Sequence, residues 1–81
     1  MSKLMIYIKP KLEEYDVKIY FYGTDGRLIR SKEFYGIKQI VIKSQEVRIS
    51  RQIFHEYLAL IVETIDPRVE TKEGSLLYIQ G

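Results

Sequence analysis

Residues 40–61, IVIKSQEVRISRQIFHEYLALI, constrain the fold most strongly because their hydrophobic period changes once along the segment. Before Ser50 the apolar residues alternate, which is the period of a β-strand. After Ser50 they recur at intervals of three and four, as at Phe54, Tyr57 and Ile61, which is the period of a helix. Ser50 stands at the junction, where its hydroxyl can cap a helix. The segment therefore predicts strands that run directly into one helix.

The rest of the chain is typical of short strands separated by turns. We expect strands at 3–8, 17–22, 27–34, 37–43, 46–49, 69–71 and 76–79, and a helix over about 51–65. Pro10 should end the first strand, and 23–26 should form a turn. The predicted fold class is α+β: a mostly antiparallel sheet of five to seven short strands with one amphipathic helix packed on it, in a single domain, 1–81.

The segment 44–50 permits two interpretations. In the first, a tight loop at 44–45 joins the strands 37–43 and 46–49 into a hairpin. In the second, Ser44 caps one long helix over 45–65. The β-branched Val47 and Ile49 favour the hairpin, because they stand two residues apart and β-branched side chains suit strands.

The predicted helix is too apolar for a single sheet to cover. At ~100° per residue its apolar side chains span roughly 200°, whereas a helix on a sheet needs an apolar stripe of little more than about 100°. We therefore expect a homodimer whose interface includes Ile53, Tyr57 and Leu60. The alternative is a curled sheet that wraps the helix within one chain.

The sequence carries no catalytic, cofactor-binding or metal-binding signature. The chain has no cysteine and a single histidine, His55. A zinc-protease motif would need a second histidine at position 59, which is Ala59. No base stands beside a candidate nucleophile, and the glycines at 23 and 26 do not match a phosphate loop. We therefore predict a protein that is not an enzyme and has no cofactor.

One group of residues suggests binding. If the first two strands point their polar faces the same way, tyrosines and cations gather there. The group comprises Tyr7, Lys9, Lys18, Tyr20, Tyr22 and Arg27. Such a face can meet a protein partner, where tyrosine is enriched, stack the bases of a nucleic acid, or be no more than an aromatic ladder that stabilises a half-exposed sheet.

Charge and composition add weaker indications. The net charge is only +2, but residues 1–51 carry eleven Lys and Arg against six Asp and Glu. Asn, Trp and Cys are absent, and a loss of thermolabile amides and thiols together with many charges is a tendency of hyperthermophile proteins. We therefore expect an archaeal or viral origin, with codon bias as the alternative explanation. No apolar run approaches the ~20 residues that cross a bilayer, and residues 4–8 are too short for a signal peptide. We predict a small cytoplasmic binding module that self-associates and engages a protein, or alternatively nucleic acid.

Overall fold

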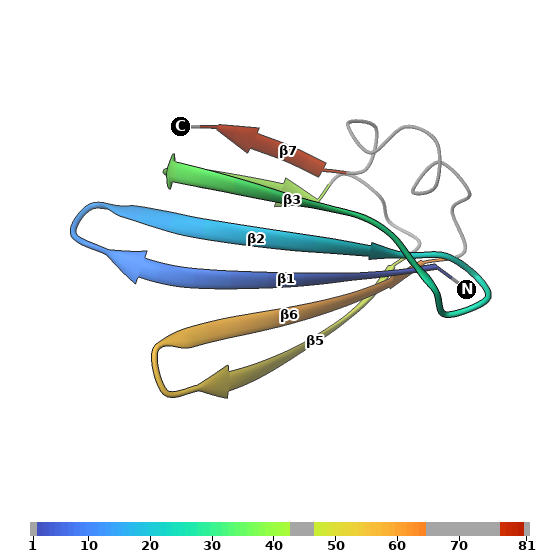
Figure 1. Cartoon of the computed structure of the whole chain (residues 1–81). Helices are drawn as coiled ribbons and strands as arrows, with labels where there is room; N and C mark the ends of the chain where they lie inside the picture. The colour runs from blue at the N-terminus through green and yellow to red at the C-terminus, as the bar shows by residue number, and fades with distance from the viewer. Residues whose placement is uncertain (1, 43–46, 65–76, 81) are drawn as a thin grey trace.

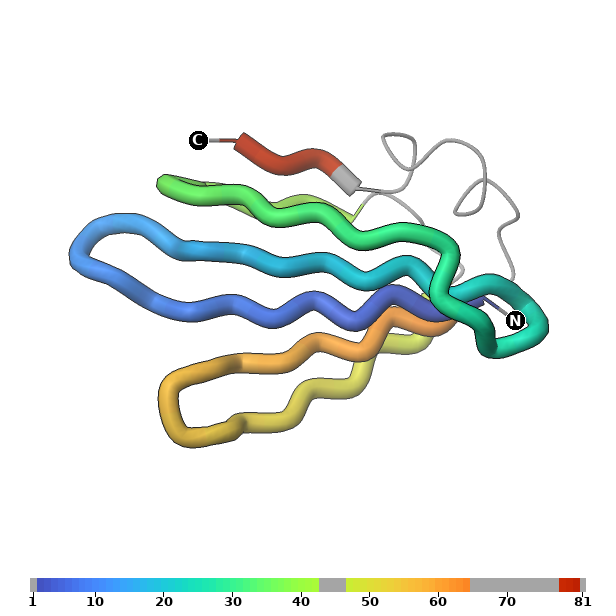
Figure 2. The backbone as a smooth tube through the Cα atoms, viewed as in Figure 1, coloured from blue at the N-terminus to red at the C-terminus, as the bar shows by residue number. Residues whose placement is uncertain are grey.

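A coiled antiparallel sheet dominates the molecule (Figures 1 and 2). The computed structural model of the chain describes residues 2–42, 47–64 and 77–80. Its strands are β1 (Ser2–Lys11), β2 (Glu14–Tyr22), β3 (Leu28–Ile37), β4 (Gln39–Ile42), β5 (Val47–Phe54), β6 (Tyr57–Thr64) and β7 (Leu77–Gln80). Five strands form one sheet in the order β3-β2-β1-β6-β5, and β4 pairs with β7 in a second, small sheet.

The predicted helix over 51–65 is wrong, and with it the α+β class. The described residues contain no helix: 51–54 complete β5, 55–56 form a turn, and 57–64 form β6. The helical interpretation failed because the run 57–62 is apolar at nearly every position, and such a run fits either period. β6 lies between β1 and β5, so sheet hydrogen bonds on both sides replace the helical ones.

The predicted helix cap at Ser50 is also wrong. Ser50 lies in the middle of β5, opposite Ile61 of β6. The actual chain reversal is the two-residue turn His55-Glu56, which joins the paired residues Phe54 and Tyr57. Position 65, the expected end of the helix, lies outside the described residues.

The predicted hairpin between 37–43 and 46–49 is not formed. β4 pairs with β7, as in Ile40 opposite Ile79, and β5 pairs with β6, as in Ile49 opposite Val62. The proposed loop at 44–45, and the strand 69–71 with its following turn, lie outside the described residues. Strand pairing depends on segments distant in sequence, which local alternation does not identify.

The first three strands are longer than predicted. β1 continues through Pro10, which pairs with Tyr15 of β2. The pairing of β1 with β6 stops at Ile8 opposite Leu58, so proline stands where β1 has no partner on that side among the described residues. β3 likewise continues to residue 37, with Gly36 at a φ of 67° near an irregularity in the ladder.

The turn predicted at 23–26 is confirmed. The amide of Gly26 donates to the carbonyl oxygen of Gly23 at 3.0 Å, and Gly26 has a φ of 80°. A positive φ at this position is accessible to glycine without steric cost.

One face of the five-stranded sheet carries the core. Its buried side chains come from β1, β2 and β6 and from the end of β3, and they are Leu4, Ile6, Val17, Ile19, Phe21, Ile37 and Val62. The small sheet packs on this face through Ile40, Ile42 and Ile79. The opposite face has no second layer among the described residues, and it carries the candidate site.

Candidate binding face

The strand register brings the predicted tyrosines onto the uncovered face of the sheet. Lys3 lies opposite Tyr22, Met5 opposite Tyr20, and Tyr7 opposite Lys18. Directly paired residues of an antiparallel ladder point the same way, so their side chains share this face. β5 and β6 add two rings that complete the cluster. The tyrosine face is defined here as Tyr7, Lys18, Tyr20, Tyr22, Phe54 and Tyr57, which line a shallow depression of about 470 Å³.

The rings of the tyrosine face contact one another and nearby ammonium groups. The ring centroids of Tyr7 and Tyr20 lie 5.6 Å apart, edge to face at 83°. Lys3 Nζ lies 5.5 Å from the centroid of the Tyr22 ring, and Lys9 Nζ lies 5.9 Å from that of Tyr57. These contacts each stabilise ring positions modestly, by ~0.5–1.5 kcal/mol. The face is therefore an ordered platform with half-exposed rings.

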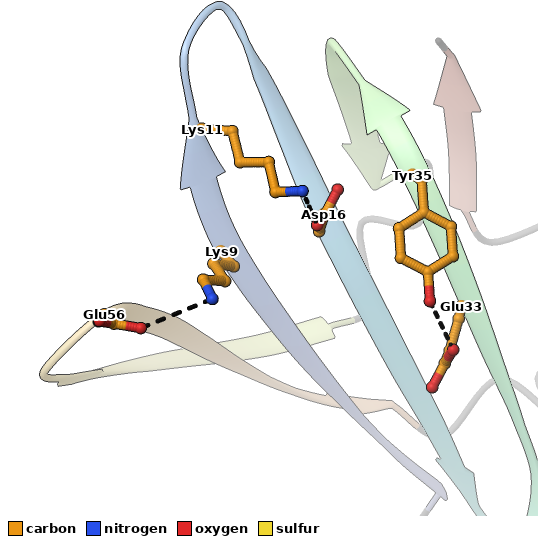
Figure 3. A network of polar contacts seen from close by, with 6 residues as sticks. All are labelled: Lys9, Lys11, Asp16, Glu33, Tyr35 and Glu56. Carbon is orange, nitrogen blue, oxygen red and sulfur yellow. Dashed lines mark hydrogen bonds and ion pairs between the residues drawn. The ribbon is translucent and has the colours of Figure 1, made fainter.

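Carboxylates balance the lysines around the platform (Figure 3). Lys9 Nζ lies 3.6 Å from Glu56 Oε2 in the turn between β5 and β6. Lys18 Nζ lies 3.6 Å from Glu33 Oε1 on β3. Ion pairs with this exposure are worth little in stability, about 0–1 kcal/mol, but they reduce the positive potential of the surface. The tyrosine face is thus aromatic and close to neutral.

Two exposed groups near the platform have shifted pKa values. The hydroxyl of Tyr35 donates a hydrogen bond to Glu33 Oε2 at 2.8 Å, and this bond and the charge of Glu33 raise the pKa of Tyr35. Lys11 Nζ lies 2.8 Å from Asp16 Oδ2, and the hydrogen bond and the negative charge raise the pKa of Lys11. Both shifts come from paired surface charges; neither group is buried, as a tuned catalytic group usually is.

The predicted residues do not all belong to this face. Tyr7, Lys9, Lys18, Tyr20 and Tyr22 lie together on it or at its edge. The sixth, Arg27, follows the turn at 23–26.

Arg27 is held by that turn and not by the platform. Its backbone amide donates to Asp25 Oδ1 at 3.0 Å, and its Nε lies 3.8 Å from Asp25 Oδ2. Its side chain is 89% exposed, so it points into solvent at the tip of the β2–β3 hairpin.

The predicted interface residues Ile53, Tyr57 and Leu60 do not form one surface. Ile53 lies opposite Leu58, and Leu60 lies opposite Ile6, so both are on the core side of the sheet. Tyr57 belongs to the tyrosine face. The excess apolar helix surface that predicted a dimer is absent from 51–64, because these residues form the end of β5, a turn and β6.

Sequence reasoning missed two aromatic residues at the site, Phe54 and Tyr35. Phe54 lies within 51–65, the segment predicted as a helix, so it was not grouped with the strand residues. Tyr35 follows the point where β3 was expected to fade, and it lines a second depression of about 230 Å³ beside Lys9 and Asp16. The segment 28–35, LIRSKEFY, does not alternate between apolar and polar residues, so its local pattern gave no signal that the strand continues to Tyr35.

Within the described residues, no group of three or more His, Cys, Asp or Glu side chains is arranged to hold a metal ion. His55 is exposed in the turn between β5 and β6. The same part of the chain contains no helix of the length and apolarity that a membrane span requires. Comparison of the chain with family models, with curated proteins and with solved structures gives no match.

Proposed function

We propose that this chain is a small, non-enzymatic binding module that self-associates and engages a protein through its tyrosine face. The proposal is supported above all by one observation: five aromatic rings stand half-exposed on a sheet face that no described segment covers. Tyrosine and phenylalanine are enriched in protein interfaces, whereas lysine and glutamate are depleted at their centres. Here the charged pairs stand at the rim and the rings at the centre.

The size of the chain also favours association. Among the described residues, the buried hydrophobic cluster comprises seven side chains on one face of a single sheet. Chains of this length bury only about 60–65% of their unfolded surface, so a partner that covers the tyrosine face adds burial that one chain lacks. The proposal includes a cytoplasmic location, which the absence of cysteine fits.

Size-exclusion chromatography with light scattering, run from low to high micromolar concentration, tests self-association. We expect a mass above the 9.6 kDa of one chain. The double variant Phe54→Ser/Tyr57→Ser should shift the protein to the monomer, because it removes two rings from the proposed interface. Leu12→Ser is the matched control, since Leu12 is 91% exposed at the tip of another hairpin. A wild-type chain that stays monomeric throughout rejects self-association.

Single-stranded nucleic acid is the second candidate, and the placement of Tyr7, Tyr20 and Tyr22 on one face of two adjacent strands favours it. Stacking a base on an aromatic ring contributes ~1–3 kcal/mol. The balanced charges of Lys9 and Lys18 weigh against it, because nucleic-acid affinity depends on unpaired cations.

Fluorescence anisotropy with labelled single strands over a salt series decides the second candidate. Binding through this face should weaken steeply as salt increases, through counterion release. Tyr20→Ala should weaken it further, by about fivefold to 100-fold. Absence of binding at low salt excludes nucleic acid as the partner.

A further inference from the structure

The outer edge of β5 has an unbalanced charge and unused hydrogen-bonding groups. β5 is the last strand of the five-stranded sheet, and no described residue pairs with its outer side. Backbone N–H and C=O groups on such an edge are a template for an additional strand. Natural proteins usually protect long edges, and β5 is eight residues long.

The side chains of β5 are unusually exposed for an apolar strand. Ile53 is 80% exposed and Ile49 is 50% exposed. Both point to the core side of the sheet, because Ile49 pairs with the buried Val62 and Ile53 pairs with Leu58. The apolar core face therefore continues onto β5 beyond the small sheet, and a strand added beside β5 would extend this face.

The two arginines of β5 differ from the cations of the tyrosine face. Among the described residues, neither Arg48 nor Arg51 takes part in an ion pair, whereas Lys9 and Lys18 do. The segment Val47–Phe54 contains no acidic residue. Within residues 2–42, 47–64 and 77–80, neither guanidinium group is in ion-pair contact with a carboxylate, and guanidinium groups bind carboxylates well.

The register places these arginines on opposite faces of the sheet. Arg48 of β5 lies opposite Glu63 of β6, and Glu63 in turn lies opposite Lys3 of β1 in the ladder. One carboxylate therefore stands between two cations on this face. Arg51 lies opposite Leu60 and lines a depression of about 330 Å³ with Ile53. Positive charge therefore remains on both sides of the edge.

We infer that β5 receives an extended acidic segment of a partner protein as an additional antiparallel strand. This inference rests on the proposed role as a protein-binding module and names the chemistry of the bound segment. Carboxylates of the incoming strand face Arg48 and Arg51, and its β-branched residues face Ile49 and Ile53. Main-chain hydrogen bonds supply affinity, and the alternating side chains supply specificity.

A second copy of this chain fits the edge less well. An antiparallel pairing of β5 with itself that brings Ile49 opposite Ile53 also brings Arg51 opposite Arg51 of the other copy. Like charges directly opposite one another destabilise a ladder. An acidic strand meets the same isoleucines without this repulsion.

The test uses the full chain and a fluorescein-labelled peptide with blocked ends, TVTETVET. In antiparallel register its valines face Ile53 and Ile49, and its glutamates face Arg51 and Arg48. We expect saturable binding by anisotropy at low salt. The lysine peptide TVTKTVKT should bind the wild-type chain at least about tenfold more weakly. TVTETVET should likewise bind the double variant R48Q/R51Q at least about tenfold more weakly than the wild type. Both effects correspond to the loss of two exposed charge pairs.

Two N-methylated versions of TVTETVET establish strand addition without altering the protein. One carries methyl groups on alternate backbone nitrogens, and the other carries them on the remaining nitrogens. Successive amides of a strand point to opposite sides, so one version should lose binding and the other should keep it. Equal binding by both, or equal binding of TVTKTVKT, overturns the inference.

Control variants separate this inference from the proposed function. Tyr20→Ser should leave peptide affinity unchanged while it weakens association through the tyrosine face. If no peptide binds and Ile53→Lys dissociates a wild-type dimer, a second copy occupies the edge and the inference is wrong. If peptide binds while light scattering finds only monomer, the edge site stands and self-association fails.

Discussion

At the scale of single residues, the surface around the sheet is organised by short carboxylate contacts. Tyr35 is the clearest case, because its hydroxyl donates to a carboxylate two residues earlier on the same strand. The contact joins β3 to the edge of the tyrosine face, since the same Glu33 also pairs with Lys18 of β2. One carboxylate thus positions both a ring and an ammonium group.

This contact predicts a pH dependence that Glu33→Gln removes. Because the pKa of Tyr35 is raised above its usual value of about 10, the folded chain holds the phenolic proton more tightly than the unfolded chain. The stabilisation is complete below about pH 10 and is lost as the pH rises through the raised value. Glu33→Gln should lower the pKa of Tyr35, measured by an NMR titration of the tyrosine ring carbons. Glu56→Gln is the control, and an unchanged Tyr35 titration in Glu33→Gln contradicts the assignment.

At the scale of elements, the β1–β2 and β5–β6 hairpins each turn over two residues. The β1–β2 hairpin turns at Leu12 and Glu13, between the paired residues Lys11 and Glu14. Glu13 has a φ of 65°, in the left-handed region. A side chain with a Cβ occupies this region at a cost of roughly 1–2 kcal/mol. The turn at 12–13 is therefore tight and strained.

Glu13→Gly should stabilise the protein. Glycine removes the left-handed strain, but it also increases the conformational entropy of the unfolded chain. That entropy lowers the free energy of unfolding by roughly 0.5–1 kcal/mol. We expect a net increase of about 0.5–1 kcal/mol in the free energy of unfolding, measured by urea denaturation. Leu12→Gly makes the same entropy change at a residue without positive φ and should destabilise. A loss of stability in Glu13→Gly would show that the turn is not strained.

At the scale of the whole molecule, β1 is the centre of the sheet. It pairs with β2 from Lys3 to Lys11 and with β6 from Ser2 to Ile8. Its second partner begins about fifty residues later in the chain, so this pairing is non-local and closes a long loop. β5, in contrast, lies at the edge of the sheet, with one described neighbouring strand and mostly exposed side chains.

Hydrogen exchange followed by NMR should reflect this arrangement. The amides of Leu4 and Ile6, in the buried centre of β1, should exchange with the slowest rates, near the global unfolding limit. Outward amides of β5 should exchange much faster. The pairing of β1 with β6 is incorrect if amides of β5 are protected as strongly as those of β1.

The sequence determined the strands 3–8 and 17–22, the turn at 23–26, and the tyrosine face that these strands carry. Alternation alone decides which way each side chain of a strand points, so Tyr7 and Tyr20 could be placed together without a structure. The ends of strands were predicted less well, because proline and glycine usually mark strand ends, whereas Pro10 and Gly36 remain inside β1 and β3.

Only the tertiary structure decided what residues 51–64 become. Their apolar residues satisfy the helical and the strand period equally, so local pattern could not choose between them. The choice came from hydrogen bonds to β1, a strand from the beginning of the chain, and the pairing of β4 with β7 is non-local in the same way. Such pairings depend on which segments, distant in sequence, can form a hydrogen-bonded ladder and pack in a common core. The local sequence pattern of one segment does not contain this information.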